Sequence, residues 1–256
     1  MTALSEILPW LNTALWHGFV IFVRIAAVTA MLPAFGEQTV PARVKLAIAL
    51  AFTLIVAPMV PVLPDVPTVG ATTLFIFSEV ISGLALGMGI RLFILALQTS
   101  GSIAAQCTSL SQVLGGAAVD PLPAMGYILI VAGLALAVMN GLHVKAAHLI
   151  LLSYDFLPRG VFVGASEISE WGVQQVSKAF SLAFTLAAPF VILSVLYNFA
   201  LGAINRAMPQ LMVAFVGAPV ITAGGLALLL VSAPYMLVVW VDAMDQFMAN
   251  PFGTLP

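Results

Sequence analysis

The sequence has very little charge. Only 7% of its 256 residues are Asp, Glu, Lys or Arg, against about 25% in a typical soluble domain. Hydrophobic residues make up 62%, and the mean hydropathy is +1.15. Such a chain cannot cover itself with a solvated surface, so the sequence predicts an integral membrane protein. The net charge of −2 excludes the basic surface that nucleic-acid binding requires, and we expect no nucleic-acid partner.

Residues that carry catalysis or bind metals are also scarce. The single cysteine, Cys107, cannot form an internal disulfide, and the three histidines lie apart without the spacing of a zinc site. Asp242 and Asp245 share one face of a predicted helix, but a solvated helix end explains this pair better than acid–base catalysis. No phosphate-binding, dinucleotide-binding or haem motif is present. The sequence therefore predicts neither an enzyme nor a bound cofactor.

Long apolar runs fill most of the chain. About 20 apolar residues in a helix cross the hydrocarbon core of a bilayer. On this measure the sequence predicts an all-α membrane protein of about six long helices, at approximately 9–32, 44–60, 72–110, 124–154, 176–205 and 211–241. Prolines inside the runs predict kinks: Pro58, Pro189, Pro219 and Pro234. No linker is long enough to divide residues 1–256 into separate domains, so we expect one domain.

The third predicted helix is longer than an ordinary span. No proline occurs between Val69 and Val119, and roughly 40 residues of helix measure about 60 Å, twice the hydrocarbon thickness. Glu79, Arg91 and three glutamines lie along it. Charged groups at membrane depth are costly unless they face protein or a water-filled cavity. This helix is therefore expected to leave the bilayer or to be surrounded by partner subunits.

Small residues on the same helix predict close helix packing. Gly83 and Gly87 form a G-x-x-x-G pair, which allows two helix backbones to approach each other closely. The motif alone does not decide whether that contact lies within this chain or between subunits.

Basic residues outside the apolar runs gather at two short motifs, VPARVKL at 40–46 and NRAMPQ at 205–210. One interpretation is that Arg43, Lys45 and Arg206 anchor helix ends at the membrane surface. The alternative is that Arg206 and Gln210 contact an acidic partner surface. The distribution of basic residues slightly favours a cytoplasmic first loop.

Several motifs together resemble one family. VPARVKLAIALAFTLIVAP, GLALG, VDP, MNGLHVKA, LPRG and LGAINRAMPQLMVAFVGAPV occur in the order and spacing of the FliR family, and the similarity covers about 24–234. This family comprises flagellar export-gate proteins and their injectisome counterpart SctT. The resemblance implies a subunit of the type III secretion export gate, located in the bacterial inner membrane within the flagellar basal body.

The resemblance also implies partners. In this family, tilted and kinked helical hairpins form part of a helical hetero-oligomeric export gate together with FliP and FliQ, and FlhB and FlhA lie nearby. The homologues of these proteins, unfolded flagellar export substrates and membrane lipid are therefore the implied partners, and no cofactor is implied.

The resemblance gives a role to the segment between the third and fourth predicted helices. In FliR-like proteins this loop extends into the pore as a plug, which by position is roughly 109–122 here. The Gly-Gly pair would let the backbone bend across the pore, the Asp-Pro pair would begin the return, and the leucine and valine would exclude water. The family often has aromatic residues before the Asp-Pro, and their absence here implies a smaller plug. The implied plug residues are Leu114, Gly115, Gly116, Val119, Asp120 and Pro121.

Two alternatives to a flagellar gate subunit stay open. One is an injectisome gate subunit of the SctT type, although VPARVKL and NRAMPQ look closer to flagellar members. The other is a small-solute carrier in which Glu79, Arg91 and Arg206 form a buried ion or substrate site. A carrier often contains matching halves, and this sequence shows no such internal symmetry.

Overall fold

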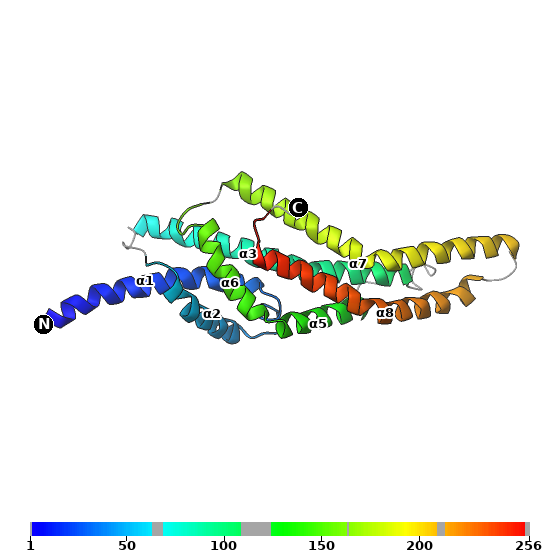
Figure 1. Cartoon of the computed structure of the whole chain (residues 1–256), viewed down its shortest axis with the longest axis horizontal. Coiled ribbons are helices and arrows are strands. Elements are labelled where there is room, and N and C mark those ends of the chain that lie inside the picture. Colours follow the sequence, from blue (N-terminus) through cyan, green and yellow to red (C-terminus); the bar gives the residue numbers. More distant parts are fainter. Residues whose placement is uncertain (1, 63–68, 109–123, 163, 209–212, 254–256) are drawn as a thin grey trace. The chain divides into compact units, whose positions relative to one another are not determined.

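The computed structural model describes residues 2–62, 69–108, 124–162, 164–208 and 213–253. These residues form helices and contain no strand (Figure 1), which confirms the predicted all-α class. The helices are α1 (Thr2–Met31), α2 (Ala42–Val56), the 3-10 turn η1 (Ala57–Met59), α3 (Val69–Thr108), α5 (Ala124–Met139), α6 (Leu142–Phe156), α7 (Ala165–Ala207) and α8 (Val213–Ala249). Five of them are long and apolar enough to cross a membrane, or six if α5 and α6 together count as one bent span.

α1 begins at Thr2 rather than near residue 9. α7 and α8 also extend beyond the boundaries predicted from hydropathy. α7 begins at Ala165 rather than near residue 176, and α8 continues to Ala249 rather than ending near residue 241. The added segments are polar, so a hydropathy window ends before them, but they contain no proline and the helix continues. α3, with 40 residues, matches its prediction. Of the four prolines expected to kink helices, Pro189 lies inside α7, Pro219 and Pro234 lie inside α8, and Pro58 lies in η1 after the end of α2.

The predicted helix at 124–154 is instead two helices. α5 and α6 meet at a break where the chain bends by 72°. Gly141, which caps α6, has φ = 77° and ψ = 35°, a left-handed conformation that favours glycine. Apolarity continues on both sides of the break, so only the Asn-Gly dipeptide marks it in the sequence.

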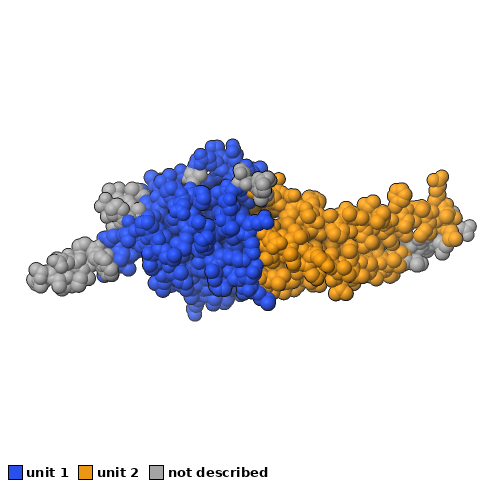
Figure 2. All heavy atoms as spheres, in the orientation of Figure 1, with its two compact units in different colours: residues 1–91, 138–175, 244–256 blue, residues 92–137, 176–243 orange. Residues whose placement is uncertain are grey.

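The chain divides into two compact units (Figure 2). Unit 1 comprises Met1–Arg91, Val138–Gln175 and Met244–Pro256, and unit 2 comprises Leu92–Ala137 and Val176–Ala243. α3, α5, α7 and α8 each contribute residues to both units.

The core of unit 1 forms around α1. Ile21, Ile25, Val28 and Leu32 are fully buried and recur at helical spacing, so they form one apolar stripe. α3 approaches α1 at two glycines: a Cβ added to Gly83 would lie 2.5 Å from the carbonyl oxygen of Arg24, and one added to Gly87 would lie 2.7 Å from Cβ of Met31. Gly83 and Gly87 thus face a helix of this same chain.

The core of unit 2 forms around Trp240 of α8. Its side chain is fully buried, and Nε1 donates a hydrogen bond of 2.7 Å to the carbonyl oxygen of Phe93 in α3. A Cβ added to Gly133 of α5 would lie 2.5 Å from Cδ1 of Leu97 in α3 and 3.6 Å, an ordinary contact distance, from the Trp240 ring. This one aromatic side chain therefore fixes three helices of the unit against one another.

The contact at Gly83 can be tested with a single methyl group. We expect Gly83→Ala to lower the free energy of unfolding by about 1–3 kcal/mol, because the methyl group meets a backbone oxygen that cannot move without shifting α1. The measurement is the thermal unfolding midpoint of the purified full-length chain in detergent. Gly172→Ala in α7 is the matched control, since an added Cβ there meets nothing within 4 Å. Equal midpoints for the two variants would contradict the proposed packing.

Candidate functional site

Unit 1 contains an ion pair that is fully removed from solvent. Arg24 of α1 donates from Nε to Oε2 of Glu79 at 2.8 Å and from Nη2 to Oε1 at 3.1 Å. Both side chains are 0% exposed. The two parallel hydrogen bonds match the planar guanidinium to the carboxylate, which is the geometry that best offsets desolvation of both charges.

The pair also holds α6 and the loop that follows it. Arg24 donates from Nη1 to Oγ of Ser153 at 3.1 Å and from Nη2 to the carbonyl oxygen of Leu157 at 2.9 Å. Glu79 accepts from the backbone N–H of Gly160 at 3.2 Å. Gly160 has φ = 71°, and a side chain there would collide with the ring of Phe75. The glycine of the LPRG motif is therefore needed for this loop to reach Glu79.

A second arginine leaves this site with an excess of positive charge. The Tyr154 ring lies 4.1 Å from the guanidinium carbon of Arg24 and 5.9 Å from that of Arg159. Burial lowers the pKa of Arg159 from its ordinary value, but a guanidinium stays charged at neutral pH. The hydroxyl of Tyr154 and Nη1 of Arg159 are buried without a hydrogen-bond partner in the described structure. We call Arg24, Glu79, Tyr154 and Arg159 the arginine cluster.

A second ion pair holds the loop between α1 and α2. Arg91 of α3 donates from Nη1 to Oε1 of Glu37 at 3.0 Å, and the two side chains are 28% and 26% exposed. Lys45 of the VPARVKL motif donates to the carbonyl oxygen of Gly36 at 2.9 Å. Arg43 of the same motif is exposed. Two cations from different helices thus fix this loop, while Arg43 remains at the surface.

A third polar group lies at the bend between α5 and α6. Lys145 donates to both carboxylate oxygens of Asp245 at 2.7 Å, and Nδ2 of Asn140 donates to the same carboxylate at 3.0 Å. The MNGLHVKA motif therefore places its asparagine and lysine on one carboxylate of α8. Asp245 is bound to other side chains, whereas its neighbour Asp242 is exposed.

The two ends of the segment predicted to be a plug meet on unit 2. Thr108, the last residue of α3, is 2% exposed, and its Oγ1 lies 3.8 Å from Sδ of Met125 in α5. Gly101 and Gly126 bring the two helices into backbone contact. Thr222 of α8 donates to the carbonyl oxygen of Thr108 at 3.2 Å. The predicted plug residues themselves, Leu114, Gly115, Gly116, Val119, Asp120 and Pro121, lie outside the described residues.

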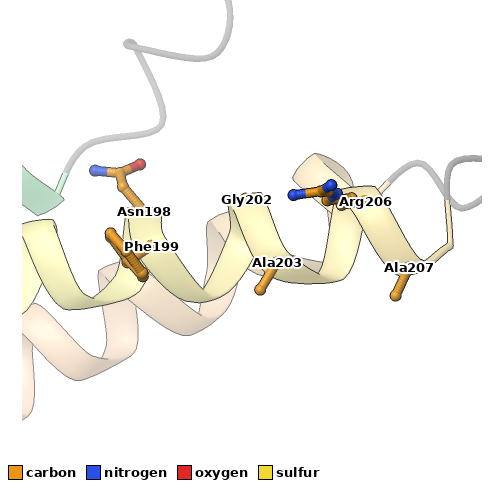
Figure 3. Close-up of a pocket in the computed structure, with 6 residues that line it drawn as sticks. All are labelled: Asn198, Phe199, Gly202, Ala203, Arg206 and Ala207. Carbon is orange, nitrogen blue, oxygen red and sulfur yellow. The ribbon is translucent and has the colours of Figure 1, made fainter.

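Arg206 lies at the exposed end of α7. It lines an open pocket of about 600 Å³ together with Asn198, Phe199, Gly202, Ala203 and Ala207. Asn198 and Arg206 point to one side of the helix in Figure 3, and the two alanines point to the other. A cation in the last turn also interacts favourably with the negative end of the helix dipole. Gln210, predicted to act with Arg206, lies outside the described residues.

The structure gives the predicted polar residues separate partners. Glu79 binds Arg24, and Arg91 binds Glu37. Arg24 was not among the residues predicted from the sequence. It is nevertheless a charge within an apolar run, FVIFVRIAAV, which is the same kind of signal that indicated Glu79. Within the described part of the chain, no group of three or more His, Cys, Asp or Glu side chains could hold a metal ion.

Fold and site together define a helical membrane protein in which the fully buried Arg24 and Glu79 neutralise each other. Residues 15–247 match the family described as bacterial export proteins, family 1. The chain is 34% identical over 232 residues to the flagellar biosynthetic protein FliR of Caulobacter vibrioides, an alignment that covers 89% of this chain and 92% of that protein. FliR of Escherichia coli K12 is 29% identical over 237 residues (89% and 86%), and FliR of Bacillus subtilis 168 is 28% identical over 228 residues (86% of each).

The chain therefore belongs to the FliR family of bacterial export proteins, and the resemblance drawn from its motifs is confirmed. The match covers both units.

The buried pair predicts an asymmetry between single and double substitutions. We expect Arg24→Met to cost about 3–5 kcal/mol of unfolding free energy, because it leaves Glu79 charged and buried without a counter-ion. The double variant Arg24→Met/Glu79→Met is expected to recover most of that loss. Arg91→Met is the control: the pair it breaks is partly exposed and should contribute at most about 1 kcal/mol. The measurement is thermal unfolding of the purified chain. A double variant as unstable as Arg24→Met would contradict the account.

Proposed function

We propose that this chain is a subunit of the flagellar export gate in the bacterial inner membrane. It assembles with FliP and FliQ homologues into a protein-conducting channel, and residues 109–122 plug the pore. Membership of the FliR family supports the flagellar export role, because the matched relatives are flagellar biosynthetic proteins. FlhB and FlhA homologues are the further partners that we propose.

One observation carries the plug proposal: α3 and α5 already touch where the segment between them begins and ends. Thr108 contacts Met125, and Gly101 contacts Gly126. Joining two helices so close together takes roughly 2–8 residues, yet the chain has fifteen here, 109–123. A long loop that returns to its starting point is more often functional than a plain connector.

The exposed apolar surface supports assembly with other subunits. α7, with 43 residues, has a contour length of about 65 Å, whereas lipid tails cover only about 30 Å. Large apolar side chains are exposed on several helices, including Phe199 on α7 at 81% and Leu230 on α8 at 80%. Helices of this length carry more apolar surface than a bilayer covers, so partner subunits are the natural cover for the remainder.

The proposed mechanism is mechanical and needs no chemical step. With the gate closed, Leu114 and Val119 keep the pore free of water, and a dewetted apolar constriction blocks ions without a charged latch. An incoming unfolded export substrate displaces the loop. The glycine pair supplies the backbone freedom for that movement, and Asp120-Pro121 directs the chain back to α5.

The two alternatives receive less support. An injectisome gate would use the same architecture, but the relatives named above are flagellar proteins. A carrier would need its charged residues free to bind a solute, whereas Glu79 and Arg91 are engaged by Arg24 and Glu37.

The plug is tested by substitutions that change only the apolar seal. We expect Leu114→Ser/Val119→Ser, and more strongly deletion of 114–119, to raise ion conductance through the closed gate, because polar groups let water enter the constriction. The measurement is the conductance of the gate, purified with FliP and FliQ homologues and reconstituted in planar bilayers. Leu114→Met/Val119→Ile is the matched control and should stay closed.

Co-purification separates the two parts of this proposal. If the chain fails to purify with FliP and FliQ homologues, the assembly itself is wrong. If the deletion variant assembles fully and conducts like the unaltered gate, the assembly stands and the plug assignment is wrong.

A further inference from the structure

An apolar groove adjoins the arginine cluster in unit 1. It lies between α3 and the first turns of α7, and consists of two hollows of about 310 and 220 Å³ that share Ser82 and Ile168. Ile81 and Phe162 line the larger hollow. Three aromatic side chains, Phe156, Trp171 and Phe252, lie at the smaller one, with ring centroids 5.4 and 5.7 Å from Phe252. The groove is thus lined mainly by apolar side chains.

The groove and the arginine cluster are built from the same two segments. On α3, Ser78 and Ser82 line the groove, and Glu79 lies between them in the sequence. In the loop after α6, Leu157 lines the groove and also accepts a hydrogen bond from Arg24, while Phe162 lies three residues beyond Arg159. The same two segments therefore carry the lining of the groove and the residues of the arginine cluster.

The arginine cluster has hydrogen-bond donors to spare. Arg24 neutralises Glu79, so the charge of Arg159 is unmatched within the cluster. Nη1 of Arg159 and the hydroxyl of Tyr154 are buried without a partner in the described structure, and a buried donor without an acceptor is costly. A group that accepts hydrogen bonds and carries negative charge would satisfy both these donors and the unmatched charge.

We propose that this site binds an anionic phospholipid. The phosphate accepts from Arg159 and Tyr154, and an acyl chain occupies the groove. Arginine matches phosphate oxygens with its planar fork of donors. The loop that carries Arg159 joins two helical segments long and apolar enough to cross a membrane, which would place it at the level of the lipid headgroups. Glu167 lines the smaller hollow, where its negative charge disfavours the headgroup.

The test compares two lipids of equal chain length. The full-length chain, purified with its partner subunits in detergent, receives phosphatidylglycerol or phosphatidylcholine, and binding is read from the thermal midpoint and from lipid retained in native mass spectrometry. We expect phosphatidylglycerol to bind more tightly. Arg159→Gln should weaken its binding roughly tenfold, because a charge-assisted hydrogen bond is lost. Arg43→Gln, which removes an exposed arginine, is the matched control and should leave binding unchanged.

Two further variants distinguish a loss of folding from a loss of lipid binding. Tyr154→Phe breaks no hydrogen bond of the described structure and keeps the ring over Arg24, so it should fold normally and weaken phosphatidylglycerol binding several-fold. Ala165→Phe fills the larger hollow from an exposed position. It should weaken phosphatidylglycerol binding but leave any effect of inorganic phosphate unchanged.

Three outcomes would overturn the proposal. Equal binding of the two lipids would remove the role of the charge. Stabilisation by inorganic phosphate as large as that by phosphatidylglycerol, with no effect of Ala165→Phe, would show a site for a small anion. Loss of partner subunits from Arg159→Gln without any change in lipid binding would show that a partner's carboxylate fills the site.

Discussion

A charge inside an apolar helix must be neutralised before that helix can enter a membrane or a protein interior. Arg24 and Glu79 meet this condition in unit 1, and four structural elements supply the hydrogen-bonding groups of the pair. α1 supplies the cation, α3 the anion, α6 the serine hydroxyl, and the loop after α6 a carbonyl oxygen and an N–H. Hydrophobic contacts can slide along one another, whereas these hydrogen bonds exist at only one register. The close approach of α1 to α3 at Gly83, whose nearest neighbour is the carbonyl of Arg24, occurs at the same level.

The other polar contacts of unit 1 follow the same pattern at lower burial. Arg91–Glu37 fixes the loop between α1 and α2, and Lys145–Asp245 fixes the bend between α5 and α6 against α8. Each of the three pairs joins residues far apart in the sequence, at a place where the chain changes direction. Few charges are present, and those that pair here hold turns and loops rather than covering the surface. These contacts give a structural role to the few ionisable residues that so apolar a chain contains.

The sequence alone was sufficient to predict the class of protein and its family. Apolar runs of 20 residues or more identify helices reliably because bilayer thickness sets their length, and the length of α3 followed from the absence of proline. The bend at Gly141 was missed because the two helices beside it are together apolar enough to pass as one span. The polar start of α7 was missed because a hydropathy window detects apolar residues, not helix.

The candidate site was less predictable than the fold. Glu79 and Arg91 could be recognised as charges at membrane depth, but their partners could not. Arg24 is 55 residues from Glu79 and 129 from Ser153, and one sequence carries no record of such pairings. The positive φ of Gly160, which brings the LPRG loop to Glu79, likewise became visible only with the helices in place.

The contact between Thr108 and Met125 limits how far residues 109–123 can extend from unit 2. Fifteen residues, 109–123, have a contour of about 50 Å when fully extended, so a chain fixed at both ends to one place extends at most about 25 Å from it. Moving its tip anywhere within that radius requires no separation of α3 from α5.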